Sequence, residues 1–294
     1  MAPKIHVGPN DPEHLIRAVQ DGGGRPVALD EAEGVVWAGS PTDLPELPGA
    51  VRWVQLPAAG VEPWLERVRA TPDVEFTSAT GAYATQVAEL ALGLLIAGVR
   101  GFAHYARVKT WDPRPEGTLE GSTVAIVGAG GIGRALIHML EPHDGQVIAV
   151  TRSGRDGTLP VDRIDEIWSR ADHFVIAAPA TDATKHLVGE RELAAMRSHS
   201  WIVNIARGSL IDTDALVAAL DAGQIGGAAL DVTDPEPLPD GHPLWDSPRA
   251  LITPHVANPP STMDRDLARR VTENVRRFGE GEELEAPVNP ENGY

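Results

Sequence analysis

Short apolar runs alternate with amphipathic helical stretches between about residue 120 and residue 256. Each run has the length of a strand and is apolar throughout, as expected of strands that are covered on both faces. Because this alternation is typical of βαβ units, it predicts a parallel sheet flanked by helices. The predicted strands are STVAIVG, QVIAV, HFVIAA, SWIVNIA, GGAALDV and ALITPH.

Two further apolar runs, AVRWVQLPAAG and DVEFTSATG, lie upstream and predict strands of a smaller α/β unit. The stretch WDPRPEGTLEG, rich in proline, glycine and charge, indicates a loop or arm before the larger unit. The closing stretch from VTENVRRF onward indicates a helix followed by a polar tail. Since 294 residues exceed one average domain, we expect two domains: residues 1–97 with 270–294, and residues 98–269.

Composition excludes several classes of protein. Cysteine is absent, which removes disulfides, thiolate nucleophiles, iron–sulfur clusters and cysteine-containing zinc sites. The histidines lack metal-binding spacing, so we expect no metal site. A net charge of −17 argues against nucleic acid or anionic membrane as a partner. No apolar stretch approaches the roughly 20 residues that span a bilayer, and no signal-peptide pattern opens the chain, so we expect a cytoplasmic protein.

A glycine-rich turn joins one predicted strand to the following helix in TVAIVGAGGIGRALIHML. Gly128, Gly130 and Gly133 have the spacing G-x-G-x-x-G, in which the glycines permit a tight turn, approach of a pyrophosphate and close helix–strand packing. Amides at the helix start, including those of Gly131 and Ile132, would bind the phosphates. We therefore predict a dinucleotide-binding domain, with a glycine-rich turn that binds nothing as the alternative.

The stretch VTRSGR bears on the choice of cofactor. In a dinucleotide fold the second strand ends in a residue that contacts the adenosine ribose, acidic for NAD and with a basic neighbour for NADP. Here Thr151 occupies that position, and Arg152, Ser153 and Arg155 follow. An arginine about 4 Å from a 2′-phosphate gains roughly 1 to 4 kcal/mol, whereas an aspartate would repel it. We expect NADP to be preferred and NAD to be a second cofactor; the alternative is that both arginines are solvated loop residues.

Polar residues follow three later strands of the predicted sheet. Arg207 follows one buried strand, Asp231 ends the next with Glu236 five residues later, and His255 follows a proline after the third. All lie beyond the carboxyl ends of parallel strands, where open α/β sheets bind ligands. Each residue also has an alternative role that involves no ligand. The alternatives are a surface ion pair for Arg207, a cap or loop bond for Asp231, a turn carboxylate for Glu236 and a structural role for His255.

Together these motifs resemble the D-2-hydroxyacid dehydrogenase family. The resemblance rests on GAGGIG, AAPATDAT, NIARGSLIDTDAL, ALDVTDPEPLP and TPHVAN in this order, with QVAELALGLLIA upstream and VNPENGY at the end. It covers nearly the whole chain. It implies an α/β fold, with a Rossmann-type doubly wound parallel sheet and a second, smaller flavodoxin-like α/β substrate domain.

The resemblance also implies an activity: reduction of a small 2-keto acid, such as glyoxylate or hydroxypyruvate, to the D-2-hydroxy acid by hydride transfer. Arg207 would bind the carboxylate and keto oxygen, and His255 would act as general acid/base. Histidine suits this step because its ordinary pKa of about 6.5 is close to neutrality. Glu236 would orient the histidine and favour its charged form.

Further contacts follow from the same resemblance. The substrate carboxylate would be bound by backbone amides of the first domain, so that domain closure would complete the site and exclude water. The family also implies a homodimer through the cofactor domains, with the arm around Trp111 as a contact. The implied substrate-binding residues are Ala59, Gly60, Val61, Arg207 and His255, and the additional cofactor-binding residues are Ala178, Pro179, Ala206, Asp231 at the nicotinamide carboxamide, and His255.

Two other functions remain as alternatives: a phosphoglycerate dehydrogenase-like NAD enzyme, and a non-enzymatic dinucleotide-sensing protein like the C-terminal binding corepressors. The chain also departs from the family pattern. Thr233 and Asp234 stand where an aromatic residue and a glutamate are common, and Asn258 stands where a small residue is usual. These differences bear on the size of the substrate, while Thr151 in place of the usual acid is the reason for expecting NADP.

Overall fold

The computed structural model describes residues 1–114 and 116–291. The chain folds into two compact units. Unit 1 holds residues 1–83 together with the segment from Pro259 onward, and unit 2 holds Ala84–Asn258. Each unit has its own parallel sheet and its own hydrophobic core, so each is a domain in its own right.

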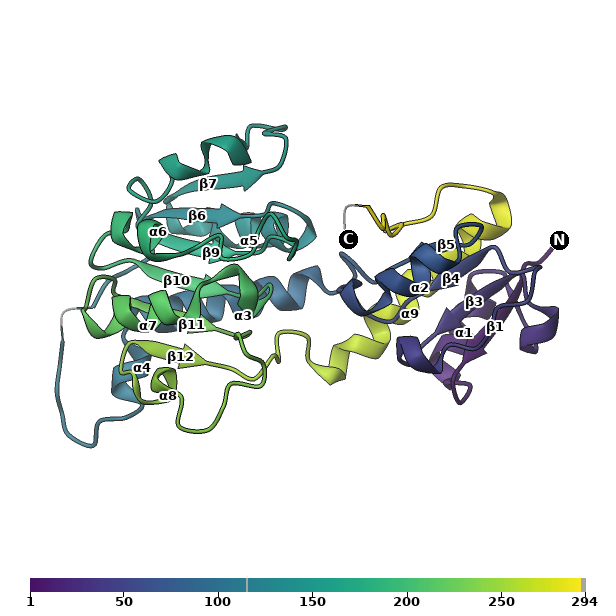
Figure 1. Ribbon diagram of the computed structural model, residues 1–294, viewed down its shortest axis with the longest axis horizontal. Helices are drawn as coiled ribbons and strands as arrows, with labels where there is room; N and C mark the ends of the chain where they lie inside the picture. Colours follow the sequence, from purple (N-terminus) through teal and green to yellow (C-terminus); the bar gives the residue numbers. More distant parts are fainter. Residues whose placement is uncertain (115, 292–294) are drawn as a thin grey trace. The chain divides into compact units, whose positions relative to one another are not determined.

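Unit 2 is built on a seven-stranded parallel sheet with the strand order β12-β11-β10-β9-β6-β7-β8 (Figure 1). All six strands predicted from apolar runs in this region are confirmed, and the two-residue strand β8 is an addition that the pattern did not predict. The strands are β6 (Thr123–Val127), β7 (Gln146–Thr151), β8 (Leu159–Pro160), β9 (His173–Ile176), β10 (Trp201–Asn204), β11 (Gly227–Leu230) and β12 (Ala250–Ile252).

Helices cover both faces of this sheet. From β6 the chain crosses to β7 in one direction and later from β9 to β10 and β11 in the other, and right-handed crossovers then put the helices on opposite faces. Accordingly α3 packs against α5, and α6 packs against α7. The strand order reverses between β6 and β9, the point where doubly wound sheets bind dinucleotides. The helices of unit 2 are α3 (Ala84–Val99), α4 (Phe102–Tyr105), α5 (Gly131–Leu140), α6 (Glu190–Ala195), α7 (Thr213–Asp221) and α8 (Pro243–Asp246).

Unit 1 has a five-stranded parallel sheet in the order β2-β1-β3-β4-β5, which is the flavodoxin-like order. The expected fold class is therefore confirmed for both sheets. Strands β4 and β5 are the two that the sequence predicted, whereas β1, β2 and β3 were missed. The elements are β1 (Lys4–Gly8), α1 (Glu13–Asp21), β2 (Arg25–Pro26), β3 (Gly34–Trp37), β4 (Trp53–Gln55), α2 (Leu65–Ala70), β5 (Glu75–Thr77) and α9 (Pro260–Glu280).

The boundaries between the units lie earlier in the chain than the sequence suggested. Helix α3 packs against α5 and β10, so it belongs to unit 2, and α9 packs against α1, so it belongs to unit 1. An apolar helix can cover either sheet, and its sequence alone does not say which. The predicted ranges 1–97 with 270–294, and 98–269, are therefore wrong at both boundaries. Within the described part of the chain, no helix combines the length and apolar character needed to cross a membrane.

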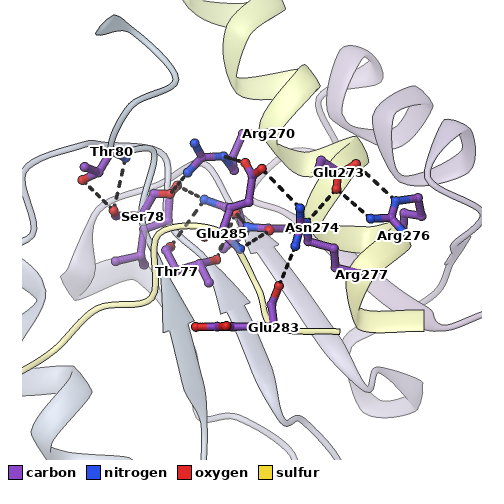
Figure 2. A network of polar contacts seen from close by, with 12 residues as sticks. Thr77, Ser78, Thr80, Arg270, Glu273, Asn274, Arg276, Arg277, Glu283 and Glu285 are labelled. Atoms are coloured by element: carbon purple, nitrogen blue, oxygen red, sulfur yellow. Dashed lines mark hydrogen bonds and ion pairs between the residues drawn. The ribbon is translucent and has the colours of Figure 1, made fainter. Parts of the chain in front are cut away.

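The C-terminal segment completes unit 1 by binding to α9 and β5 (Figure 2). The side chain of Asn274, fully buried on α9, donates to Gln55 Oε1 at 2.8 Å and to the Glu285 carbonyl at 3.1 Å. Its Oδ1 accepts the Glu285 N–H at 2.8 Å. Beyond this point the Val288 N–H donates to the Phe76 carbonyl of β5. Buried amide groups, all paired, thus join the two chain segments of unit 1.

His173 is a buried titratable residue at the start of β9, with only 4% of its surface exposed. Its Nδ1 accepts the N–H of Trp201 on the neighbouring strand at 3.2 Å. Burial lowers the pKa of His173 from 6.5 to about 4, because the charged ring would lose its hydration. Asp172 opposes this shift in pKa and His199 adds to it. The imidazole is therefore neutral at pH 7.

We predict that His173 makes the stability of unit 2 depend on pH. Between pH 6.5 and 4 the unfolded chain binds a proton at this residue that the folded chain does not, so stability is present above pH 6.5 and falls by up to roughly 3 kcal/mol toward pH 4. Melting temperatures measured across this range should fall less in His173→Asn than in the wild type. The exposed His138→Asn should keep the wild-type slope, and an unchanged slope in His173→Asn would contradict the prediction.

Candidate active site

Four of the predicted site residues follow the carboxyl ends of three neighbouring strands in unit 2. Arg207 follows β10, Asp231 and Glu236 follow β11, and His255 follows β12. These strands lie side by side in the order β12-β11-β10. Because parallel strands end at the same edge of a sheet, the fold brings the loops that carry these side chains to one edge.

His255 and Glu236 form a close pair. Nδ1 of His255 lies 2.6 Å from Oε1 of Glu236, while Oε2 of Glu236 is 3.4 Å from the Thr233 N–H. About half of each side chain remains exposed, 52% for His255 and 42% for Glu236. An ionised carboxylate can only accept hydrogen bonds, so Nδ1 donates to it. Nε2 is then the ring nitrogen left to give or take a proton, as a general acid/base requires.

The backbone at His255 has an uncommon conformation, with φ at +53°. This left-handed region costs a non-glycine residue roughly 1 kcal/mol. Two hydrogen bonds hold it there: the His255 N–H donates to the Asp231 carbonyl at 2.8 Å and to the Thr253 carbonyl at 3.0 Å. The direction of the imidazole is thus determined by the ends of β11 and β12.

Asp231 anchors the loop that carries His255. Its carboxylate, 1% exposed, accepts from the Thr253 hydroxyl at 2.6 Å and from the N–H groups of Val256 at 2.9 Å and Ala257 at 3.0 Å. The loop-bonding alternative considered for Asp231 is therefore present in the structure. A carboxylate has about four acceptor positions, so one is left over. A contact between Asp231 and the nicotinamide carboxamide stays a prediction.

Arg207 is held by a residue that the sequence analysis missed. Asn204, the fully buried last residue of β10, donates to the Arg207 carbonyl at 2.9 Å and accepts the Ala206 N–H at 3.1 Å. The half-buried guanidinium donates in turn to the Ala206 carbonyl at 2.7 Å. A polar residue at the end of the apolar run WIVN was the available signal, since buried polar side chains normally carry hydrogen bonds.

The glycines of the G-x-G-x-x-G turn have distinct surroundings. Gly128 has φ at +102°, and a Cβ there would lie 2.5 Å from the Ala177 carbonyl oxygen. A Cβ on Gly133 would lie 2.2 Å from the Gly128 oxygen, whereas one on Gly130 would meet nothing within 4 Å among the described residues. The fold thus requires the first and third glycines and leaves open space at the second. That is the clearance a pyrophosphate needs in a dinucleotide site.

The start of α5 supplies donors beside this space. Among the described residues, no acceptor bonds the N–H groups of Gly131, Ile132 and Gly133, which are the first three residues of the helix. Helix N-termini of this kind bind phosphate through free N–H groups and the positive end of the helix dipole. Ala178 and Pro179 follow β9, and Ala206 follows β10, so they lie at the same edge of the sheet. The residues present therefore fit a dinucleotide.

A tight turn follows β7 at the predicted ribose position. The Thr151 hydroxyl lies 2.6 Å from the Thr158 hydroxyl and accepts the Gly154 N–H at 3.1 Å, so it stabilises the turn. Arg152 and Arg155 are both exposed on this turn. The Gly128 N–H donates to the carbonyl of Val150, which places the end of β7 beside the glycine-rich turn.

The predicted substrate-binding loop lies in unit 1, after β4. Ala59 is exposed, Gly60 is half-buried and Val61 is buried. Within residues 1–114 and 116–291, the N–H groups of these three residues have no hydrogen-bond acceptor. Backbone amides without a protein partner can bind a carboxylate.

A cavity of about 660 Å³ lies at the opposite edge of the unit 2 sheet. Its lining includes Asp172 and His173 at the start of β9, Trp201 at the start of β10 and Gly226 before β11. None of the catalytic candidates lines it. Open α/β sheets bind their ligands at the carboxyl edge, so this cavity is not the candidate active site. Nowhere in the described part of the chain are three His, Asp or Glu side chains placed to hold a metal ion.

The glycine-rich turn that fits a dinucleotide and the pair of His255 and Glu236 lie at the same edge of the unit 2 sheet. Together they are typical of a dinucleotide-dependent oxidoreductase. Residues 92–257 match the family described as D-isomer specific 2-hydroxyacid dehydrogenase, NAD binding domain. The chain belongs to the D-isomer specific 2-hydroxyacid dehydrogenase family, whose members are NAD(P)-dependent oxidoreductases.

Individual proteins agree with this assignment. The chain is 39% identical to an uncharacterised protein encoded in the proB 3′ region of Corynebacterium melassecola, covering 94% of this chain and 95% of the relative. It is 32% identical to a glyoxylate reductase of Thermofilum pendens, covering 73% of this chain and 68% of that protein. A D-isomer specific 2-hydroxyacid dehydrogenase from Xanthobacter autotrophicus Py2, solved with NADPH and MES, has the same fold, with a TM-score of 0.84, 24% identity and full coverage of both chains.

We predict that two glycine substitutions separate cofactor binding from folding. Gly130→Ala should keep the wild-type melting temperature, because its Cβ meets no protein atom within 4 Å, but should weaken NADPH binding roughly tenfold or more by occupying pyrophosphate space. Gly133→Ala should lower the melting temperature, because its Cβ would overlap the Gly128 carbonyl. Calorimetric titration and thermal melts measure the two effects. Wild-type NADPH affinity in Gly130→Ala would place the dinucleotide elsewhere.

Proposed function

We propose that this protein reduces a small 2-keto acid, such as glyoxylate or hydroxypyruvate, to the D-2-hydroxy acid, with NADPH preferred over NADH. The observation that carries the proposal is the 2.6 Å pair of His255 and Glu236 after β12 and β11, next to the strand that precedes Arg207. Similarity to a protein named glyoxylate reductase supports a small keto acid as the substrate.

The side chains of unit 2 supply the proton and the positive charge that this reaction needs. The reduced nicotinamide, when bound, supplies the hydride. His255 gives a proton from Nε2 to the keto oxygen, and Glu236 holds the ring through Nδ1 so that Nε2 keeps its direction. Arg207 attracts the negative charge of the substrate carboxylate and of the oxygen that becomes the hydroxyl.

In this proposal the loop of unit 1 binds the substrate carboxylate as well. Backbone N–H groups around Ala59, Gly60 and Val61 hold the carboxylate, since they have no acceptor among the described residues. Amide donors suit a carboxylate because hydrogen bonds to a charged acceptor are about twice as strong as those between neutral groups. This arrangement favours acids with a carboxylate next to the reacting carbonyl.

The homodimer implied by the family resemblance stays a prediction. Unit 2 exposes large apolar side chains, with Trp111 98% and Phe102 55% exposed. Exposed apolar groups of this size are typical of interaction surfaces when they cluster. They support a contact through the arm around Trp111.

We predict that the purified protein oxidises NADPH when given glyoxylate or hydroxypyruvate, and that His255→Gln lowers kcat by roughly 10² to 10⁴-fold through loss of the proton donor. His186→Gln is a matched control, because His186 also has a positive φ and pairs with a carboxylate, Asp212, at 3.4 Å. It should keep the wild-type rate.

The substrate panel also includes 3-phosphohydroxypyruvate with NADH. Faster turnover of that compound would replace the proposal by a phosphoglycerate dehydrogenase-like activity. No turnover of any keto acid would refute it.

We predict that Arg152 and Arg155 select NADPH. Changing both to Gln should raise the KM for NADPH roughly tenfold or more, because two guanidinium groups near a 2′-phosphate are lost, and should leave the KM for NADH nearly unchanged. Arg163→Gln is the control: this exposed arginine pairs with Glu166 after β8 and should alter neither KM. Equal effects on both cofactors would make Arg152 and Arg155 ordinary loop residues.

A further inference from the structure

The loop Pro57–Val61 is held from one side by a single neighbouring segment. The Tyr83 hydroxyl donates to the Pro57 carbonyl at 2.9 Å, the Ala79 N–H donates to the Ala58 carbonyl at 2.9 Å, and the Thr80 hydroxyl donates to the Ala59 carbonyl at 3.1 Å. Three successive carbonyl groups of the loop are therefore bonded to residues 79–83.

These bonds determine where the neighbouring N–H groups point. In a planar trans peptide the C=O and the N–H point in opposite directions. The N–H groups of Ala58, Ala59 and Gly60 are thus each directed away from the donor that holds the preceding carbonyl. No acceptor among the described residues bonds any of the three. With the Val61 N–H, the loop therefore offers four consecutive donors that have no acceptor among the described residues, and these bonds orient the first three. The donor on Ala58 is one that the sequence did not indicate.

The hydroxyl of Thr80 has its direction set by Ser78 (Figure 2). The Ser78 hydroxyl accepts the Thr80 N–H at 3.2 Å and donates to the Thr80 oxygen at 2.8 Å. The Thr80 hydrogen is then left to bond the Ala59 carbonyl. Ser78 is 3% exposed, and its carbonyl accepts from Arg270 of α9 at 3.2 Å. The support for the loop thus extends to the long helix of unit 1.

The hydroxyl of Tyr83 remains a donor throughout the neutral range. The pKa of Tyr83 is raised to about 12, chiefly by burial and also by the carboxylates of Asp266 and Asp264, while the charge of Arg270 acts in the opposite direction. The side chain is 6% exposed. A phenolate would be unable to donate to Pro57, and the shifted pKa keeps that form unpopulated at working pH.

We infer that Thr80 and Tyr83 are positioning residues for the substrate carboxylate. They hold the loop so that the N–H groups of Ala58, Ala59 and Gly60 bind the carboxylate together, and neither hydroxyl touches the substrate itself. The inference rests on the proposed reduction of a 2-keto acid, and it assigns the selection of the acid group to two residues outside the loop that binds it.

Removing either hydroxyl tests this role. Thr80→Val and Tyr83→Phe keep the side-chain shape but remove the hydroxyl. Each should raise the KM for the keto acid by about threefold to tenfold, because that is the effect of losing one hydrogen bond. The KM for NADPH should stay at the wild-type value. Thr80→Ser should restore the KM, because it restores the donor. Thr71→Val is the matched control: it removes a hydroxyl that bonds the Arg67 carbonyl at 2.8 Å in the same unit, and it should leave every kinetic constant unchanged.

A second measurement does not depend on turnover. NMR order parameters of the Ala58, Ala59 and Gly60 amides should fall in Thr80→Val and Tyr83→Phe and remain at the wild-type value in Thr71→Val. Unchanged order parameters, or lowered ones with an unchanged KM for the keto acid, would overturn the inference. If the wild type reduces no keto acid, the proposed function falls, and a titration with oxamate then tests the inference separately. Shifts of these amide signals on addition of oxamate, smaller in the two variants than in the wild type, support the inference. Absent shifts refute it.

Discussion

The buried carboxylate of Asp231 is the interaction on which the rest of the active site depends. It receives three hydrogen bonds from the segment that carries His255, and its carbonyl accepts the His255 N–H. Hydrogen bonds to a charged acceptor are each worth about 1.5 to 3 kcal/mol, which exceeds the roughly 1 kcal/mol cost of a positive φ at His255. Asp231, which follows β11, thus stabilises the strained backbone at His255, which follows β12. The imidazole reaches Glu236 because the strain is compensated there.

The direction of the strands explains why the chemistry gathers where it does. All strands of unit 2 run parallel, so the glycine-rich turn, the turn at Thr151 and the loops after β10, β11 and β12 all belong to the carboxyl edge. The cavity of about 660 Å³ is at the amino edge and contains none of these groups. This cavity therefore lies at the edge of the sheet opposite the candidate site. Strand polarity and free amide donors identify the carboxyl edge as that of the candidate site.

Long apolar runs and strand-end motifs could be read from the sequence, whereas features that depend on packing could not. The apolar runs of unit 2 predicted six of its strands, but β1 in unit 1 interrupts its apolar residues with Lys4 and His6 and was missed. The placement of α3 and α9 depends on which sheet each helix covers. Arg207, Glu236 and His255 were predicted from their positions after apolar runs, and their roles from the family resemblance. Asn204 and Thr80 were missed, because their roles depend on hydrogen bonds that spacing does not specify.

Unit 1 is assembled from two stretches of chain with the whole of unit 2 between them. The buried Trp53 of β4 packs against Phe278 of α9, with ring centroids 5.3 Å apart, and the buried amide of Gln55 is bonded by Asn274 of α9. During synthesis the first stretch leaves the ribosome long before these partners exist, whereas unit 2 is continuous and can close its sheet at once. Unit 2 can therefore be complete before unit 1, whose first stretch lacks its packing against α9 until that helix emerges.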